Sequence, residues 1–180
     1  MAAYTEAFAE LTLTAEKRLR WPEIDLPQHN QVLRLWRYPS FEPYVSWLVY
    51  SPVARYRDVN SSLAVRVSWD RPFDTARFRD PMKGLAHGSA VEPAITLKQI
   101  EIPVTDVDSR LATLASIKVP VMIDRSIVVD GEICGFESFG LTTVRLTWCS
   151  NAPDTWQPIV DWAAETIDFL EQAFERQSIS

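Results

Sequence analysis

The sequence predicts an α+β fold in which residues 1–180 form a single domain on a mainly antiparallel sheet of about six to seven strands. Short segments that alternate apolar and polar residues predict half-buried strands. The connectors between most of them are too short for helical crossovers, which favours antiparallel neighbours. Apolar residues recur at helical spacing near the N-terminus, in the middle and at the C-terminus. A length of 180 residues with 47% hydrophobic content suits one compact unit.

The first 50 residues predict one helix and two strands. Trp21-Pro22 ends the helical pattern. The segments QVLRLWRY and YVSWLVY then alternate as strands do, and YPSFEP between them has the composition of a turn. The apolar face of the helix consists of Tyr4, Phe8, Leu11, Ala15 and Leu19.

Residues 63–69 show the clearest strand alternation in the chain, with apolar residues at every second position. The segment that follows, residues 70–93, is less regular. We expect a long loop there, with one or two helical turns that begin at Pro72. Part of this loop should be ordered, because Phe73, Phe78 and Leu85 can bury apolar surface.

The second half of the chain predicts a strand over residues 95–102 and a helix from Thr105 that ends before Pro120. The segment LTTVRLTW predicts a further strand. A long helix is expected over residues 154–177. The three predicted helices would all pack on the sheet.

The segment VDGEICGFE, residues 129–137, groups three acids with a cysteine and could be a small chemical site. Asp130-Gly131 is a strong hairpin signal, however. With a second turn at Phe139-Gly140, Ile133 lies opposite Leu146, and an apolar face forms that packs as a core. The other face would collect Glu132, Cys134, Thr143, Arg145 and Thr147. Glu137 would approach the rim, so the segment is interpreted as a register device whose polar face could still hold a ligand.

Charge and composition argue against several classes of protein. A net charge of −6 argues against nucleic acid as a partner, because duplex binding needs a basic surface. No apolar stretch approaches the roughly 20 residues that would span a membrane. The start MAAYTEAFAE has no signal-peptide pattern, and two cysteines form no disulfide framework. These features predict a cytoplasmic protein.

Metal and nucleophile patterns are weak. His29 and His87 have no other ligand residues at metal-binding spacing. His87 is followed by Gly88-Ser89, but the strand-turn-helix context of a nucleophile elbow is missing. Cys134 has acidic neighbours that raise a thiol pKa, which favours an inert thiol. No glycine-rich phosphate loop is present. We therefore expect no catalytic residue, metal or cofactor from the motifs.

An arginine-rich segment is the first candidate binding site. A planar guanidinium suits carboxylate or phosphate, so these arginines could form an anion site between the sheet and the loop at residues 71–93. Aspartates are interleaved with them, and surface ion pairs explain the same composition. The arginines are Arg55, Arg57, Arg66, Arg71, Arg77 and Arg79.

An acidic stripe on the C-terminal helix is the second candidate. Five acids fall at helical spacing opposite the apolar face, and such a stripe could meet a basic protein partner. A solvated helix face is the alternative explanation. The acids are Asp161, Glu165, Asp168, Glu171 and Glu175.

Residues 119–174 resemble a pattern found in uncharacterised bacterial α+β proteins, some of them proposed as immunity proteins of polymorphic toxin systems. The residues that carry the resemblance are Asp130-Gly131, Trp148, Pro153, Trp156 and Pro158. The resemblance implies no catalytic residues. Together with the acidic charge, it predicts a non-enzymatic protein that binds another macromolecule, such as a toxin that it neutralises. The alternative is a small-molecule or anion-binding protein, or an enzyme, that uses the arginine-rich segment.

Overall fold

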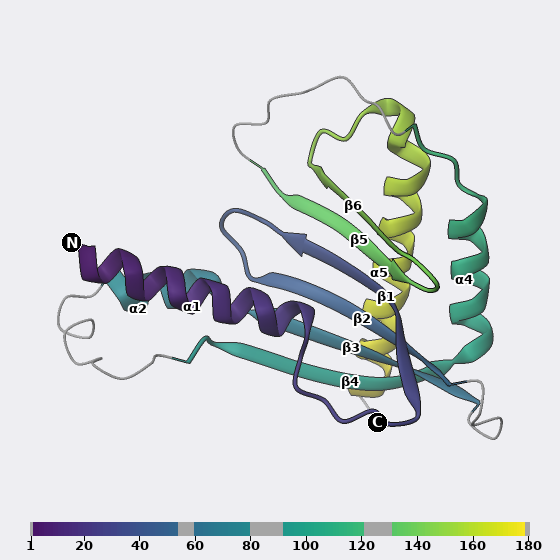
Figure 1. The fold of residues 1–180 in the computed structure, drawn as a ribbon, viewed down its shortest axis with the longest axis horizontal. Helices are drawn as coiled ribbons and strands as arrows, with labels where there is room; N and C mark the ends of the chain where they lie inside the picture. The colour runs from purple at the N-terminus through teal and green to yellow at the C-terminus, as the bar shows by residue number, and fades with distance from the viewer. Residues whose placement is uncertain (1, 54–59, 80–91, 121–130, 179–180) are drawn as a thin grey trace.

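The chain folds around a six-stranded antiparallel sheet with the strand order β4-β3-β2-β1-β5-β6 (Figure 1). The computed structural model describes residues 2–53, 60–79, 92–120 and 131–178. Within these residues the strands are β1 (His29–Tyr38), β2 (Tyr44–Pro52), β3 (Ser61–Trp69), β4 (Ile95–Pro103), β5 (Ile133–Phe139) and β6 (Thr143–Cys149). The predicted α+β class with an antiparallel sheet is confirmed.

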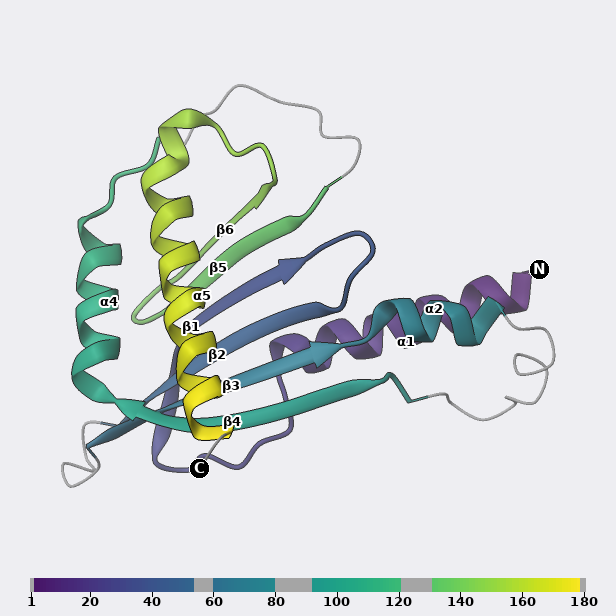
Figure 2. The same cartoon turned by 180° about the vertical axis from the view of Figure 1, so that it is seen from behind.

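Helices lie on both faces of this sheet. In the described part of the chain they are α1 (Ala2–Arg20), α2 (Arg71–Arg79), α4 (Val104–Ser116) and α5 (Gln157–Ser178), and the 3-10 turn η1 (Asp154–Trp156) precedes α5. Figure 1 shows α1 on one face, and Figure 2 shows α4 and α5 on the other. The predicted N-terminal, middle and long C-terminal helices are therefore confirmed.

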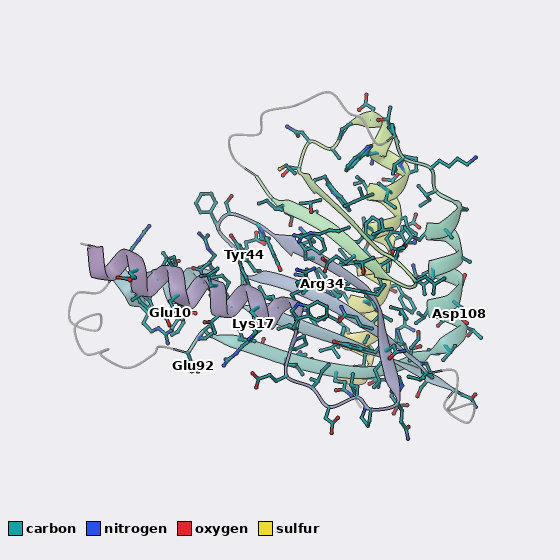
Figure 3. The ribbon with its side chains drawn as sticks, in the orientation of Figure 1. Glu10, Lys17, Arg34, Tyr44, Glu92 and Asp108 are labelled. Carbon is teal, nitrogen blue, oxygen red and sulfur yellow. The ribbon has the colours of Figure 1, made fainter. Side chains whose placement is uncertain are left out.

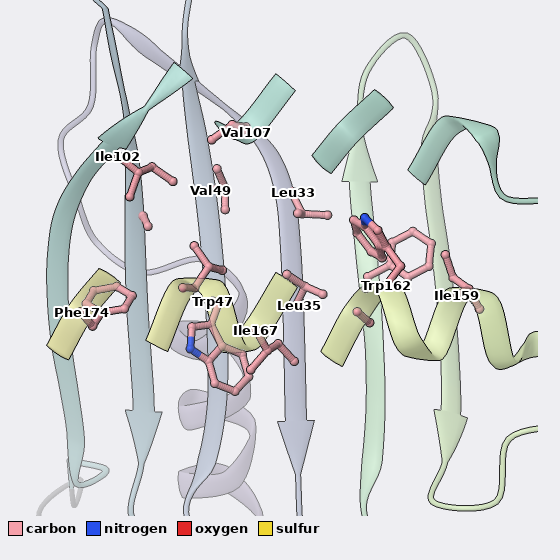
Figure 4. Close-up of a cluster of buried hydrophobic side chains, with 14 of the residues drawn as sticks. Leu33, Leu35, Trp47, Val49, Ile102, Val107, Ile159, Trp162, Ile167 and Phe174 are labelled. Atoms are coloured by element: carbon pink, nitrogen blue, oxygen red, sulfur yellow. The ribbon is translucent and has the colours of Figure 1, made fainter. Parts of the chain in front are cut away.

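The larger core lies between the sheet and the layer formed by α4 and α5 (Figure 4). Strand alternation directs Leu33 and Leu35 of β1 to this side, where the indole of Trp162 packs edge-on against Phe136. Trp162 also donates a hydrogen bond from Nε1 to the carbonyl oxygen of Arg110, at 3.1 Å, which joins α5 to α4. Burial of each large apolar side chain contributes about 1.5–3 kcal/mol, so this layer anchors the sheet.

A smaller core lies between α1 and the other face of the sheet. Leu11, Ala15 and Leu19 of α1 are buried against residues of β2 and β3, among them Leu48 and Val65. α1 therefore covers the β2–β3 part of this face. Among the described residues, Figure 1 shows no helix over β5 and β6 on this face.

The segment predicted as a partly ordered loop begins with the nine-residue helix α2. Asp70 accepts a hydrogen bond from the backbone N–H of Phe73 at the start of this helix. Asp74 is fully buried and accepts hydrogen bonds from Trp69 Nε1, at 2.7 Å, and from the backbone N–H of Ala94, at 2.9 Å. These bonds tie α2 to the end of β3 and the start of β4. Residues 80–91 lie outside the described residues.

The predicted register of β5 and β6 is wrong. Ile133 pairs with Cys149 rather than with Leu146, a difference of three residues. The cause is the turn, because Phe139 remains in β5 and pairs with Thr143, so three residues rather than two join the strands. The ring of Phe139 lies 5.9 Å from that of Trp21, which favours its place in the strand. The predicted hairpin at Asp130 lies outside the described residues.

A shift by an odd number of residues exchanges the two faces of a strand. Cys134 therefore faces the α5 core, while Arg145 faces the α1 side, so they do not share the polar face predicted for them. Glu137 was expected at the rim and is instead fully buried. Glu132, predicted on the same face as Arg145, pairs instead with Arg37, at 2.7 Å.

Candidate functional site

The arginines of the predicted anion site lie on opposite faces of the sheet. Arg66 of β3 forms an ion pair with Glu171 on the α5 side, at 2.7 Å. Arg71 of α2 lies on the α1 side, where its guanidinium stacks over Tyr44. Arg77 pairs with Asp74 of its own helix. Arg79 is exposed, and Arg55 and Arg57 lie outside the described residues.

The acidic stripe of α5 remains largely open to solvent. Four of its members are exposed, and we call them the acidic face: Asp161, Glu165, Asp168 and Glu175. Glu171 differs from the others. Its Oε1 accepts hydrogen bonds from Trp47 Nε1, at 2.8 Å, and from Arg66 Nε, at 2.7 Å. Glu171 therefore helps to hold α5 on the sheet.

A different set of charged residues is brought together on the α1 side of the sheet, around the buried carboxylate of Glu137. Arg20 Nη2 donates to Glu137 Oε1 at 2.6 Å, and Arg20 Nε donates to Oε2 at 3.2 Å. Arg34 Nη1 donates to Oε2 at 3.2 Å. Arg145 Nε lies 3.8 Å from Oε1. Among the described residues, three guanidinium groups thus surround one carboxylate.

Strand register explains this arrangement. Arg34 of β1 lies directly opposite Glu137 of β5, and Glu137 lies directly opposite Arg145 of β6. Directly opposed side chains on one face are close neighbours, so the three strands align the charges in a row. Arg20 reaches the same carboxylate from the last residue of α1. The row depends on the three-residue connection between β5 and β6, which the sequence did not predict.

Arg34 is the most enclosed of these cations, with only 3% of its surface exposed. Its Nη2 donates to the hydroxyl of Tyr38, at 2.6 Å, and to the hydroxyl of Ser46, at 3.2 Å. Burial lowers the pKa of Arg34 and raises the pKa of Tyr38. Within the described structure, the Nε of Arg34 is buried without a hydrogen-bond partner. This arginine keeps its charge at neutral pH, because a guanidinium pKa ordinarily lies far above 7.

The indole of Trp36 forms the base of the arrangement. Its ring centroid lies 4.6 Å from Cζ of Arg34 and 5.3 Å from Cζ of Arg145, so two guanidinium groups contact one ring. Trp36 lies opposite Gly135 of β5. A Cβ atom at residue 135 would be 2.2 Å from Cζ2 of Trp36, so the close approach of the indole requires glycine.

A pocket of about 450 Å³ opens between α1 and this part of the sheet. We call it the basic pocket and define it by its charged lining residues, Lys17, Arg20, Arg34 and Arg145, together with Glu16. Figure 3 labels Lys17 near the end of α1 and Arg34 on the neighbouring part of the sheet. The volume lies in the range of small-molecule sites.

The basic pocket and the carboxylate at its wall have an excess of positive charge. Four cationic side chains line the pocket, while Glu16 and Glu137 supply two negative charges, which leaves +2. Three apolar side chains at its edge are unusually exposed. They are Leu13, Trp21 and Ile133, with exposed fractions of 68%, 48% and 44%. The site therefore combines positive charge with apolar contact surface.

A second pocket, of about 240 Å³, lies on the opposite face between β5, β6 and α5. Cys134 lines it, and burial raises the pKa of this thiol to about 12. The thiol is therefore protonated at neutral pH and is a poor nucleophile, which agrees with the reasoning from its acidic neighbours. Among the described residues, no three His, Cys, Asp or Glu side chains gather as a metal site.

The sequence contains one signal for the basic pocket that the motif search did not use. Arg34 stands between Leu33 and Leu35 in a strand with few exposed positions. An arginine at a buried strand position needs an acidic partner, but its identity depends on a strand about 100 residues away.

No helix of the described chain is both long and apolar enough to cross a membrane. Comparison with known proteins finds no matching family model, curated protein or solved structure.

Proposed function

We propose that this protein is a binding protein whose ligand carries a negatively charged group held in the basic pocket. The observation that carries the proposal is the gathering of Arg20, Arg34 and Arg145 around the single carboxylate of Glu137. One carboxylate cannot neutralise three guanidinium groups. Positive charge that remains in a partly enclosed site is costly unless a counter-ion joins it.

Arg145 is the cation best placed to contact a ligand. Its side chain is 53% exposed, and its contacts in the described structure are a 3.8 Å approach to Glu137 and the ring of Trp36. Arg20 is 37% exposed and Lys17 is exposed as well, so both can turn donors toward the pocket. Guanidinium groups bind carboxylates and phosphates through paired charge-assisted hydrogen bonds. These features support ligand binding at the outer side of the cluster.

Anion binding can be measured by calorimetric titration with sulfate, phosphate and citrate at constant ionic strength. We expect saturable binding of at least one of these anions, weakened roughly tenfold in Arg145→Gln because one charge-assisted contact is lost. Arg18→Gln is the matched control, since Arg18 also lies on α1 but pairs with Glu92 outside the basic pocket. Absence of saturable binding, or equal weakening by both substitutions, would contradict the proposal.

A second candidate function is the neutralisation of a basic protein, such as a toxin, by the acidic face of α5. The observation in its favour is the exposure of Asp161, Glu165, Asp168 and Glu175 along one helix. Exposed charges of one sign accelerate the encounter with an oppositely charged partner. The resemblance of residues 119–174 to proposed immunity proteins points to the same class.

The second candidate is tested with the paired substitution Glu165→Lys and Asp168→Lys. The unchanged protein should capture a basic protein from extracts of its own cells, and should relieve growth arrest when that protein is expressed alone. The paired variant should do neither, whereas a control with Glu6→Lys and Glu10→Lys, which makes the same charge change on α1, should do both. Capture that does not depend on the acidic face would exclude this role for α5.

A further inference from the structure

We infer that the anionic group is the dianion of a phosphate monoester and that the ester carries a flat ring, which lies on the apolar edge of the basic pocket. This inference rests on the proposed function, because it names the ligand of the same site. The charge of the pocket, the directions of its donors and the exposed aromatic side chain beside them support it.

The charge of the site favours a dianion. Lys17, Arg20, Arg34 and Arg145 face Glu16 and Glu137, and the sum is +2. A monoanion would leave one uncompensated positive charge in a partly enclosed site, where Coulomb energies exceed those in bulk water. A phosphate monoester carries about −1.5 to −2 charges at pH 7. Its charge therefore matches the excess positive charge of the pocket.

The donors approach from different elements. Arg20 reaches the carboxylate of Glu137 from the end of α1, and Arg145 reaches the same Oε1 atom from β6. Lys17 stands one helical turn before Arg20 and also lines the pocket. A planar carboxylate is satisfied by one bidentate guanidinium, whereas the three oxygens of a phosphate accept hydrogen bonds from several directions. Donors from two elements suit the phosphate geometry.

The apolar edge indicates what is attached to the phosphate. The indole of Trp21 is 48% exposed and adjoins Arg20, whose Cζ lies 5.3 Å from the ring centroid. Ile133 and Leu13, both exposed, also line the pocket. Exposed aromatic rings bind flat ligands by stacking on their faces. A ring joined to the phosphate would cover this exposed surface.

The test is calorimetric titration of the full chain with phenyl phosphate, phenyl sulfate and inorganic phosphate at pH 7.5 and constant ionic strength. Phenyl sulfate has the same ring but one negative charge, and inorganic phosphate has the charge without the ring. We expect phenyl phosphate to bind about tenfold more tightly than either, since each lacks one of the two interactions. Adenosine 5′-monophosphate and phosphotyrosine then distinguish a nucleotide from a phosphorylated tyrosine as the source of the ring.

Lowering the pH provides a second measurement that needs no substitution. The second pKa of a phosphate monoester is about 6, so its charge falls between pH 7.5 and 5.5. Affinity for phenyl phosphate should fall over this range, and affinity for phenyl sulfate should not. The groups facing the site are Glu16, Lys17, Arg20, Arg34, Tyr38, Glu137 and Arg145, and none is a histidine. Any titration of the protein would change its affinity for both ligands. A difference between the two pH dependences therefore reports on the charge of the ligand.

Trp21→Ala should weaken the binding of phenyl phosphate severalfold and leave the affinity for inorganic phosphate unchanged. Equal affinities for phenyl phosphate and phenyl sulfate would overturn the dianion inference and leave the proposed anion-binding function intact. Equal affinities for phenyl phosphate and inorganic phosphate would overturn the inference that the ester carries a flat ring. Failure of all anions to bind would overturn the inference together with the proposed function.

Discussion

Replacing Glu137 with glutamine is expected to lower the free energy of unfolding by about 3 kcal/mol or more, the cost typical of breaking a buried ion pair from one side. Glutamine keeps the shape of the side chain but removes the only negative charge in contact with Arg20, Arg34 and Arg145 in the described structure. Arg34 would then hold a buried charge without a counter-ion. Urea unfolding followed by circular dichroism measures the loss.

Glu132→Gln is the matched control for this substitution. Glu132 also lies near β5 and pairs with one arginine, Arg37, but both side chains remain partly exposed. Exposed ion pairs contribute about 0–1 kcal/mol, because water screens the charges. We expect the control to lose less than about 1 kcal/mol. A loss of equal size in the two variants would mean that the cluster around Glu137 is not energetically special.

Gly135→Ala is the second substitution with a large expected effect. The new Cβ would lie 2.2 Å from Cζ2 of Trp36 and 2.5 Å from the carbonyl oxygen of Leu146. Trp36 cannot turn away easily, because Arg34 and Arg145 contact its ring. The β5–β6 pair or the indole must shift, and we expect a loss of about 2–3 kcal/mol of stability by analogy with overpacked cores.

Gly140→Ala controls for the removal of a glycine in the same hairpin. The nearest atom to its added Cβ is the carbonyl oxygen of Thr142, at 3.9 Å, which is an ordinary contact. Stability should change by less than about 0.5 kcal/mol. Chemical denaturation of the two variants side by side checks the contrast. If Gly135→Ala were as stable as Gly140→Ala, the close packing of Trp36 on β5 would be refuted.

Most secondary structure could be predicted because its signals are local. The helical spacing of Leu11, Ala15 and Leu19 marks the face of α1 that is buried. The alternation in residues 63–69 marks β3, whose apolar positions pack under α1. In each case one element carries the whole pattern. Prediction was weaker for residues 71–79, because the helix there depends on Asp74, whose hydrogen bonds come from outside the helix.

The register of β5 and β6 could not be predicted with the same success. A choice between a two-residue and a three-residue turn decides which face each residue joins. In the observed register Phe139 stays in β5, with its ring 5.9 Å from that of Trp21 in a distant segment. The two-residue turn predicted from the sequence places Glu137 at the rim and puts Arg145 on the same face as Cys134. The candidate site was missed for this reason, since its charges meet only in the observed register.

By itself, the sequence determined the fold class, the positions of the helices and most strands, and the apolar faces that bury them. Only the tertiary structure decided that Arg20, Arg34 and Arg145 surround Glu137, and that Glu171 belongs to an internal ion pair rather than to the acidic face. The physical reason is the range of the interactions. Periodic burial acts within one element, whereas charge pairing across a sheet depends on strand order and register, which the whole chain sets together.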